Sequence, residues 1–211
     1  MNKITRFAVF VSFLSVLAAF PVGCSEDGAG GGSDLGDNDR NLVVCLGDSI
    51  THGEGCDGQP YPPRLAAMSG KRVLNCGAGG TTTSHAASVV SSALARKPGF
   101  VCILYGANDC IRGVDKEKSI ENLRYAVRAC RANKSKVIIA TPTPMVGSHA
   151  IFEGRTADLA AAIRLMALQE GVTCIDLHAA FGSGVGLLNS DGLHPTEAGS
   201  DFIARKFNSK M

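Results

Sequence analysis

The fold is decided by the stretch NLVVCLGDSIT, which occupies residues 41–51 of the 211-residue chain. Its first six residues form an almost continuous apolar run, and Gly-Asp-Ser follows where that run ends. A run of this kind is typical of a β-strand that is buried on both faces, as in a parallel sheet covered by helices. The stretch therefore predicts a strand of a parallel sheet, with polar residues in the loop at its carboxyl end.

Strands and helices alternate over the rest of the chain. Further strands are predicted at residues 71–75, 100–105, 136–140 and 172–176. Helical spacing falls at residues 84–96, 116–132 and 155–170, and a last helix is predicted from residue 195 to about residue 207. This order predicts a doubly wound, flavodoxin-like three-layer α/β/α domain with five parallel strands and right-handed crossovers. Ligands bind such sheets beyond the carboxyl ends of the strands, so the loops there hold the functional candidates.

The N-terminal segment is typical of an export signal. Lys3 and Arg6 precede an apolar stretch at residues 7–20, which is too short for an unassisted transmembrane helix. The following Pro-Val-Gly-Cys resembles a bacterial lipobox, although Pro21 stands where Leu is usual. We therefore predict a lipoprotein signal peptide at residues 1–23 and lipidation of Cys24, with plain secretory cleavage nearby as the alternative.

The segment after this signal predicts a tether. Residues 24–40 are rich in Gly, Asp and Ser and have almost no apolar side chains, so we expect a flexible linker there and the folded domain at residues 41–211. Ser25 follows the cysteine, and the absence of Asp at this place favours the outer membrane. The expected location is an exported lipoprotein anchored to the outer membrane or to a membrane that faces the periplasm.

Composition argues against several other classes of protein. The formal charge is +2, and the two basic residues of the signal account for it, so the mature chain is near neutral and no nucleic-acid partner is expected. The glycine-rich stretch from Gly77 fails the dinucleotide pattern, because Thr82 stands at the third glycine position. His85, His149 and His178 have no ligand-type neighbours in the sequence, so no metal site is expected.

Four short blocks fall on the predicted functional loops. They lie at residues 46–51, 75–81, 105–109 and 191–195. Each alone is a common turn sequence, but in their order and spacing they resemble the four blocks of the SGNH hydrolase family, the GDSL-like lipases and esterases. The resemblance covers essentially all of residues 41–209. It implies the SGNH hydrolase fold and a carboxylic ester hydrolase that needs no cofactor.

The chemistry of acyl transfer explains the residue types in these blocks. A serine hydroxyl needs a base to take its proton, and a histidine needs a carboxylate to hold its tautomer. By resemblance, Ser49 is the nucleophile, and Asp191 and His194 complete the triad. The oxyanion donors are then the backbone N–H groups of Ser49 and Gly80 and the side-chain amide of Asn108. Gly80 follows from counting along the second block, which has two other glycines.

Several points stay open at this level. The primary expectation is an acyl-esterase or lysophospholipase-like enzyme, because the long connection at residues 141–154 is rich in apolar side chains. A carbohydrate O-acetyl esterase is the enzymatic alternative, and a non-catalytic ligand-binding surface lipoprotein is the alternative from another class. His52 either lines the site or is a solvated loop residue. In the family's sheet the loops of Cys56 and Cys110 are neighbours, which suggests a disulfide beside the site, against two free thiols.

Overall fold

The computed structural model describes residues 34–55 and 60–211. Five parallel strands form one sheet in the order β2-β1-β3-β4-β5, which is the flavodoxin-like order. Their bounds are β1 Asp39–Gly47, β2 Arg72–Gly77, β3 Pro98–Leu104, β4 Lys136–Ala140 and β5 Thr173–Ile175. The predicted fold class is confirmed, and each predicted strand lies within a few residues of an observed one.

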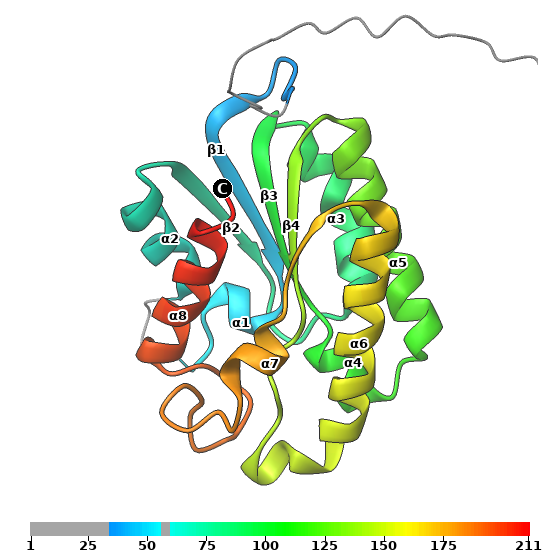
Figure 1. Cartoon of the computed structure of the whole chain (residues 1–211), viewed down its shortest axis with the longest axis vertical. Coiled ribbons are helices and arrows are strands. Elements are labelled where there is room, and N and C mark those ends of the chain that lie inside the picture. The colour runs from blue at the N-terminus through cyan, green and yellow to red at the C-terminus, as the bar shows by residue number, and fades with distance from the viewer. Residues whose placement is uncertain (1–33, 56–59) are drawn as a thin grey trace, which may run out of the picture. The chain divides into compact units, whose positions relative to one another are not determined.

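Helices cover both faces of the sheet, which makes the three layers seen in Figure 1. One face carries α3 (Thr83–Leu94), α5 (Lys116–Ala132) and α6 (Glu153–Glu170), and the other carries α2 (Tyr61–Ser69) and α8 (Glu197–Asn208). Shorter helices follow the strands at their carboxyl ends: α1 (Ser49–His52), α4 (Ala107–Arg112), the 3₁₀ helix η1 (Gly147–Phe152) and α7 (Leu177–Phe181). The short helices α1, α4, η1 and α7 therefore gather at the carboxyl edge of the sheet.

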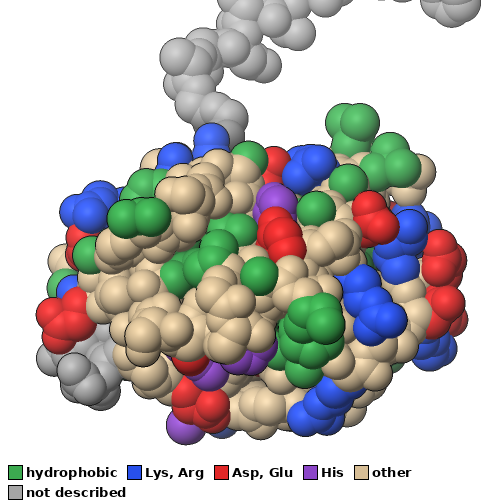
Figure 2. Space-filling view, turned by 90° about the horizontal axis from the view of Figure 1, so that it is seen from below, with side chains coloured by type: hydrophobic (Ala, Val, Ile, Leu, Met, Phe, Trp, Pro, Cys, Tyr) green, Lys and Arg blue, Asp and Glu red, His purple; other side chains and the backbone are tan. Residues whose placement is uncertain are grey.

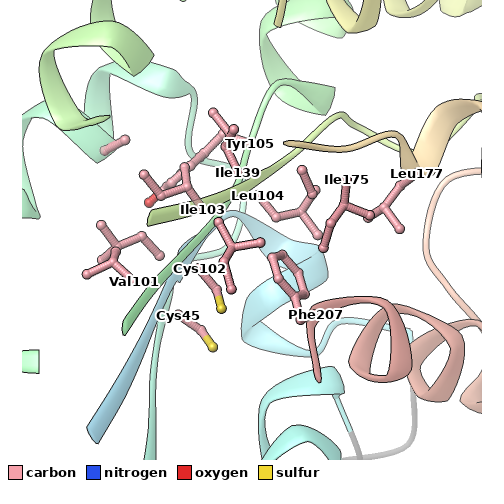
Figure 3. Close-up of a cluster of buried hydrophobic side chains, with 14 of the residues drawn as sticks. Cys45, Val101, Cys102, Ile103, Leu104, Tyr105, Ile139, Ile175, Leu177 and Phe207 are labelled. Carbon is pink, nitrogen blue, oxygen red and sulfur yellow. The ribbon is translucent and has the colours of Figure 1, made fainter. Parts of the chain in front are cut away.

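The core is built on the two central strands. Every residue of β3 is buried, as are Leu42 to Gly47 of β1, because helices pack on both faces. Cys45 and Cys102 are partners across these strands, and their sulfur atoms lie on the side of Phe207 from α8 (Figure 3). Phe207 stacks on Tyr61 of α2 with 5.3 Å between ring centroids. These contacts hold β1 rigidly in the middle of the domain, directly before the predicted nucleophile.

The folded domain includes residues before the predicted linker boundary at residue 40. Leu35 is buried in the core with 4% exposure, and the Asn38 side-chain amide donates to the carbonyl oxygen of Asn133 at 2.6 Å. A single apolar side chain thus anchors a segment whose composition looked wholly flexible. The predicted signal peptide and Cys24 lie outside the described residues.

The described chain starts at the amino edge of the sheet, and its short helices α1 and α7 lie at the opposite edge (Figure 1). Within residues 34–55 and 60–211, no helix is long and apolar enough to cross a bilayer.

Candidate active site

The loops after β1, β2 and β3 start at one level of the sheet. Gly47, the last residue of β1, is aligned with Gly77 of β2 and with Leu104 of β3. The predicted nucleophile and the predicted oxyanion donors follow these positions by a few residues, so the register brings three of the four sequence blocks to one edge. Figure 2 looks onto this end of the molecule, where histidine and acidic side chains lie next to one another at the surface.

Ser49 is the first residue of α1, and its hydroxyl lies at the turn from strand to helix. The Asp48 side chain caps this helix by accepting a hydrogen bond from the Ile50 N–H at 3.0 Å. A side chain at Gly47 would collide with Thr51 and would come within 2.7 Å of the Leu104 carbonyl oxygen. Only glycine therefore permits this close turn, which holds Ser49 at the end of the buried strand.

The three predicted triad residues come together in the structure. His194 Nε2 lies 3.1 Å from Ser49 Oγ, and His194 Nδ1 lies 2.6 Å from Asp191 Oδ2. A carboxylate can only accept, so Nδ1 carries the proton and Nε2 is left to accept the proton of Ser49. This is the arrangement that general-base activation of a serine requires.

Asp191 is held as an ionised acceptor by its own turn. Its second oxygen accepts hydrogen bonds from the backbone N–H groups of Leu193 at 2.9 Å and His194 at 3.1 Å. Desolvation opposes ionisation, but these bonds and the bond from the His194 ring outweigh it and lower the pKa of Asp191. Gly192 completes the turn with φ of +72°, and a side chain there would collide with the Val146 carbonyl.

The triad loop is fixed to the domain by contacts that the sequence did not reveal. The Val146 N–H donates to the Gly192 carbonyl oxygen at 2.9 Å, and the Asn189 amide donates to the Gly55 carbonyl oxygen at 2.6 Å. His149 of η1 places its Nδ1 2.7 Å from the backbone carbonyl oxygen of the triad aspartate. The long connection after β4 therefore supports the catalytic loop, a role that composition alone does not signal.

The oxyanion candidates lie on the loops after β2 and β3. Gly80 has φ of +67°, and the Asn108 amide donates to the Thr81 carbonyl oxygen at 3.0 Å, which uses one of its two N–H bonds. The buried Asp109 fixes this loop, because its carboxylate accepts from the Thr83 hydroxyl at 2.6 Å and from the Ser119 hydroxyl at 2.9 Å. Sequence reasoning assigned no role to Asp109, since a carboxylate after a strand is usually a turn residue.

Asp48 is the most perturbed acid of the site. It is fully buried, and desolvation raises its pKa to about 7, with a smaller contribution from the charge of Asp109. One oxygen caps α1, and the other has no hydrogen-bond partner among the described residues. The Gly-Asp-Ser turn therefore places, beside the nucleophile, a carboxyl group whose ionised form is destabilised by burial.

The structure describes one of the two cysteines of the suggested disulfide. Cys110 is a free thiol with 4% exposure, and Cys56 lies outside the described residues. Cys110 faces inward from α4, where burial raises its pKa to about 11 in spite of a hydrogen bond with the Thr156 side chain of α6. Helix α4 thus turns the Cys110 side chain toward the core.

His85, His149 and His178 have hydrogen-bond partners in the protein, whereas His52 is 58% exposed and lies 4.0 Å from Glu54. His178 Nε2 lies 2.8 Å from Glu153, and His85 Nδ1 lies 2.9 Å from the Tyr105 hydroxyl. Among the described residues, no three His, Cys, Asp or Glu side chains group as metal ligands.

A family model decides the classification, because it matches residues 45–202 and is described as the GDSL-like lipase/acylhydrolase family. The chain belongs to this family. Its members are carboxylic ester hydrolases, and the triad makes this GDSL-like chain a serine ester hydrolase. No curated protein matches it.

Solved structures similar to this GDSL-like hydrolase share its fold. A lipase/acylhydrolase from Enterococcus faecalis has 26% identity and a TM-score of 0.71, with 81% of this chain and 94% of that chain covered. Axe2, an acetylxylan esterase from Geobacillus stearothermophilus, has 22% identity and a TM-score of 0.69, with coverage of 82% and 94%. A lipolytic G-D-S-L family member from Veillonella parvula has 20% identity and a TM-score of 0.68, with coverage of 78% and 94%.

Proposed function

We propose that this hydrolase cleaves esters of short acyl groups through an acyl-Ser49 intermediate. The observation that carries the proposal is the unbroken chain from Ser49 Oγ through His194 to Asp191. His194 Nε2 takes the serine proton as Ser49 Oγ attacks the ester carbonyl, and Asp191 stabilises the imidazolium that forms. The Ser49 and Gly80 N–H groups and the Asn108 amide are the donors for the negative oxygen.

The second half of the reaction uses the same base. His194 gives its proton to the oxygen of the leaving alcohol, so the alcohol departs neutral and the acyl group stays on Ser49. Water then loses a proton to His194 and attacks the acyl carbon. His194 returns this proton to Ser49 Oγ as the bond between the acyl carbon and Ser49 breaks, so the carboxylic acid leaves and the free site is restored.

The connection after β4 supports a short acyl group rather than a long one. Of its large apolar side chains, Met145 is buried with 1% exposure, and Val146 and Phe152 pack against the core, so only Ile151, with 85% exposure, faces solvent. One exposed apolar side chain is a small wall for a long acyl chain. The likeness in fold to an acetylxylan esterase agrees with an acetyl group as substrate.

The test is hydrolysis of p-nitrophenyl acetate, butyrate and octanoate by the mature chain. We expect rates to fall with chain length, and Ser49→Ala and His194→Ala to lower kcat by at least about 10³-fold. Ser91→Ala, an exposed serine of α3, is the matched control and should retain full activity. Equal rates in the parent and both triad variants would refute the mechanism, and a preference for octanoate would refute the short acyl group.

We also propose that the mature protein is a lipoprotein tethered through Cys24. The lipobox-like sequence supports this, and so does the start of the described chain at the amino edge of the sheet, away from the catalytic loops. Detergent-phase partition of the protein expressed in a bacterium, compared with Cys24→Ala, tests it. Equal partition of the two would refute the anchor.

A further inference from the structure

Glu54 stands directly beside the catalytic base. Its backbone N–H donates to the Ser49 carbonyl oxygen at 3.0 Å, which ties it to the helix of the nucleophile. One carboxylate oxygen lies 3.8 Å from His194 Nε2, the same atom that faces Ser49. The other oxygen occupies the space in which a side chain at Gly79 would lie. The carboxylate therefore lies between the base and the loop that leads to the oxyanion donor Gly80.

This carboxylate is free to accept hydrogen bonds. Apart from the 3.8 Å contact, its nearest ionisable neighbour is His52 at 4.0 Å, and both contacts exceed hydrogen-bonding distance. Within residues 34–55 and 60–211, no donor bonds to its oxygen atoms, and 48% of the side chain is exposed. A charged acceptor of this kind forms its strongest bonds with hydroxyl or N–H groups that a ligand brings.

A groove of about 510 Å³ is lined by Glu54 together with residues of α2 and β2. Pro62, Pro63 and Val73 give it an apolar wall, and Glu54 and Asn75 give it a polar rim. A sugar ring has a matching division, with C–H groups on its faces and hydroxyl groups on its edge. The volume lies in the range of pockets that bind small molecules.

Glu54 connects this groove to the triad, because it lines the groove and lies 3.8 Å from His194 Nε2. His194 Nε2 must reach the oxygen of the leaving alcohol to protonate it, and Glu54 is the carboxylate that lies beside Nε2. We propose that the groove is the subsite for the leaving alcohol, and that Glu54 accepts hydrogen bonds there from the free hydroxyl groups of an acylated sugar. This inference rests on the proposed function. A phosphate in the alcohol would be repelled by the carboxylate, so phospholipids are disfavoured.

Two acetate esters that differ only in the alcohol test the subsite. One is a mono-O-acetyl methyl xyloside, the other is phenyl acetate, and the readout is the ratio of their kcat/KM values. We expect Glu54→Ala to lower this ratio by at least about tenfold, because a hydrogen bond to a charged group is lost. Glu54→Gln keeps one acceptor oxygen and should give an intermediate ratio.

Two further variants make the readout specific. Glu121→Gln removes the same charge from the exposed outer side of α5 and should leave the ratio unchanged. Gly79→Ala should lower the ratio in the same direction as Glu54→Ala, because the added methyl group displaces the Glu54 carboxylate. Melting temperatures of all variants establish that they are folded.

Two results would overturn the subsite. One is an unchanged ratio in Glu54→Ala. The other is acetylcholine as the better substrate of the parent, with its turnover abolished in Glu54→Gln, which would make Glu54 a cation site. A parent that hydrolyses neither acetate ester would overturn the proposed function, and the subsite with it.

Discussion

Asp191→Asn is the substitution that tests the triad with the least damage to the fold. The asparagine oxygen can still accept the backbone N–H groups of Leu193 and His194, so the turn that holds the loop is retained. At the other position an NH₂ group replaces the oxygen that lies 2.6 Å from His194 Nδ1. Two donors cannot face each other, so the imidazole adopts the tautomer with its proton on Nε2.

The expected loss of kcat follows from that tautomer. An Nε2–H can no longer accept the Ser49 proton across the 3.1 Å contact, and no carboxylate stabilises the imidazolium. The corresponding change in a serine protease triad lowers kcat by about 10⁴-fold. We expect a loss of about 10³–10⁴-fold here, equivalent to about 4–5.5 kcal/mol in activation free energy.

The assay is the kcat for p-nitrophenyl acetate, with Ser49→Ala as the measure of background and melting temperature as the measure of folding. Asp191→Ala is the comparison, since it loses the two backbone bonds as well and should also lower the melting temperature. An Asp191→Asn enzyme that is folded and keeps more than about a tenth of the parent kcat would show that the tautomer argument is wrong.

The other predictions concern stability. The raised pKa of Asp48, about 7, makes the folded state bind more protons than the unfolded chain between about pH 4 and pH 7, so the free energy of unfolding falls as pH rises. Asp48→Asn should flatten that urea-denaturation profile and gain up to about 4 kcal/mol at pH 8; a profile like that of the parent contradicts this. Gly192→Ala should cost about 1–3 kcal/mol and most of kcat, because its methyl group meets the Val146 carbonyl at positive φ, and unchanged activity would oppose this. Hydrogen bonds from Arg128 and Arg124 lower the pKa of Glu170 to about 2. The contribution of these ion pairs to the free energy of unfolding is therefore lost as pH falls from about 4.5 to 2. Glu170→Gln should lower the melting temperature by about 2–4 °C at pH 7 but not near pH 2, and an equal loss at both pH values would count against the ion pairs.

Regular elements with clear end signals could be predicted from the sequence. Helix α5 and strand β4 have the predicted bounds, because Asp115 caps the helix and an apolar stripe runs along it. Helix α2 was not predicted, because Pro62 and Pro63 near its start are easily taken for loop residues, although proline is tolerated in a first turn. The linker boundary was wrong because one apolar residue, Leu35, anchors an otherwise polar segment.

The residues of the site also fall into those that the sequence reveals and those that only the fold reveals. Ser49, Asp191 and His194 could be assigned because each lies in a sequence block whose chemistry is recognisable. Glu54 and His149 could not, because their roles depend on which loops the fold brings together, and neither residue has a local signature. The state of Cys110 could not be predicted from the adjacency of two loops, because adjacency does not fix that α4 turns this side chain into the core, where it is a free thiol.

The base and the nucleophile belong to parts of the molecule that need not lose order together. Ser49 is fixed by the buried strand β1, but Asp191 and His194 lie on a loop after α7, which hydrogen bonds to Val146, Gly55 and His149 and the buried Leu193 side chain hold in place. Local opening of that loop breaks these contacts and leaves the sheet intact. Heating should therefore abolish turnover reversibly several degrees below the temperature at which the whole domain unfolds. Loss of activity would then report the opening of the loop, and calorimetry would report the unfolding of the sheet.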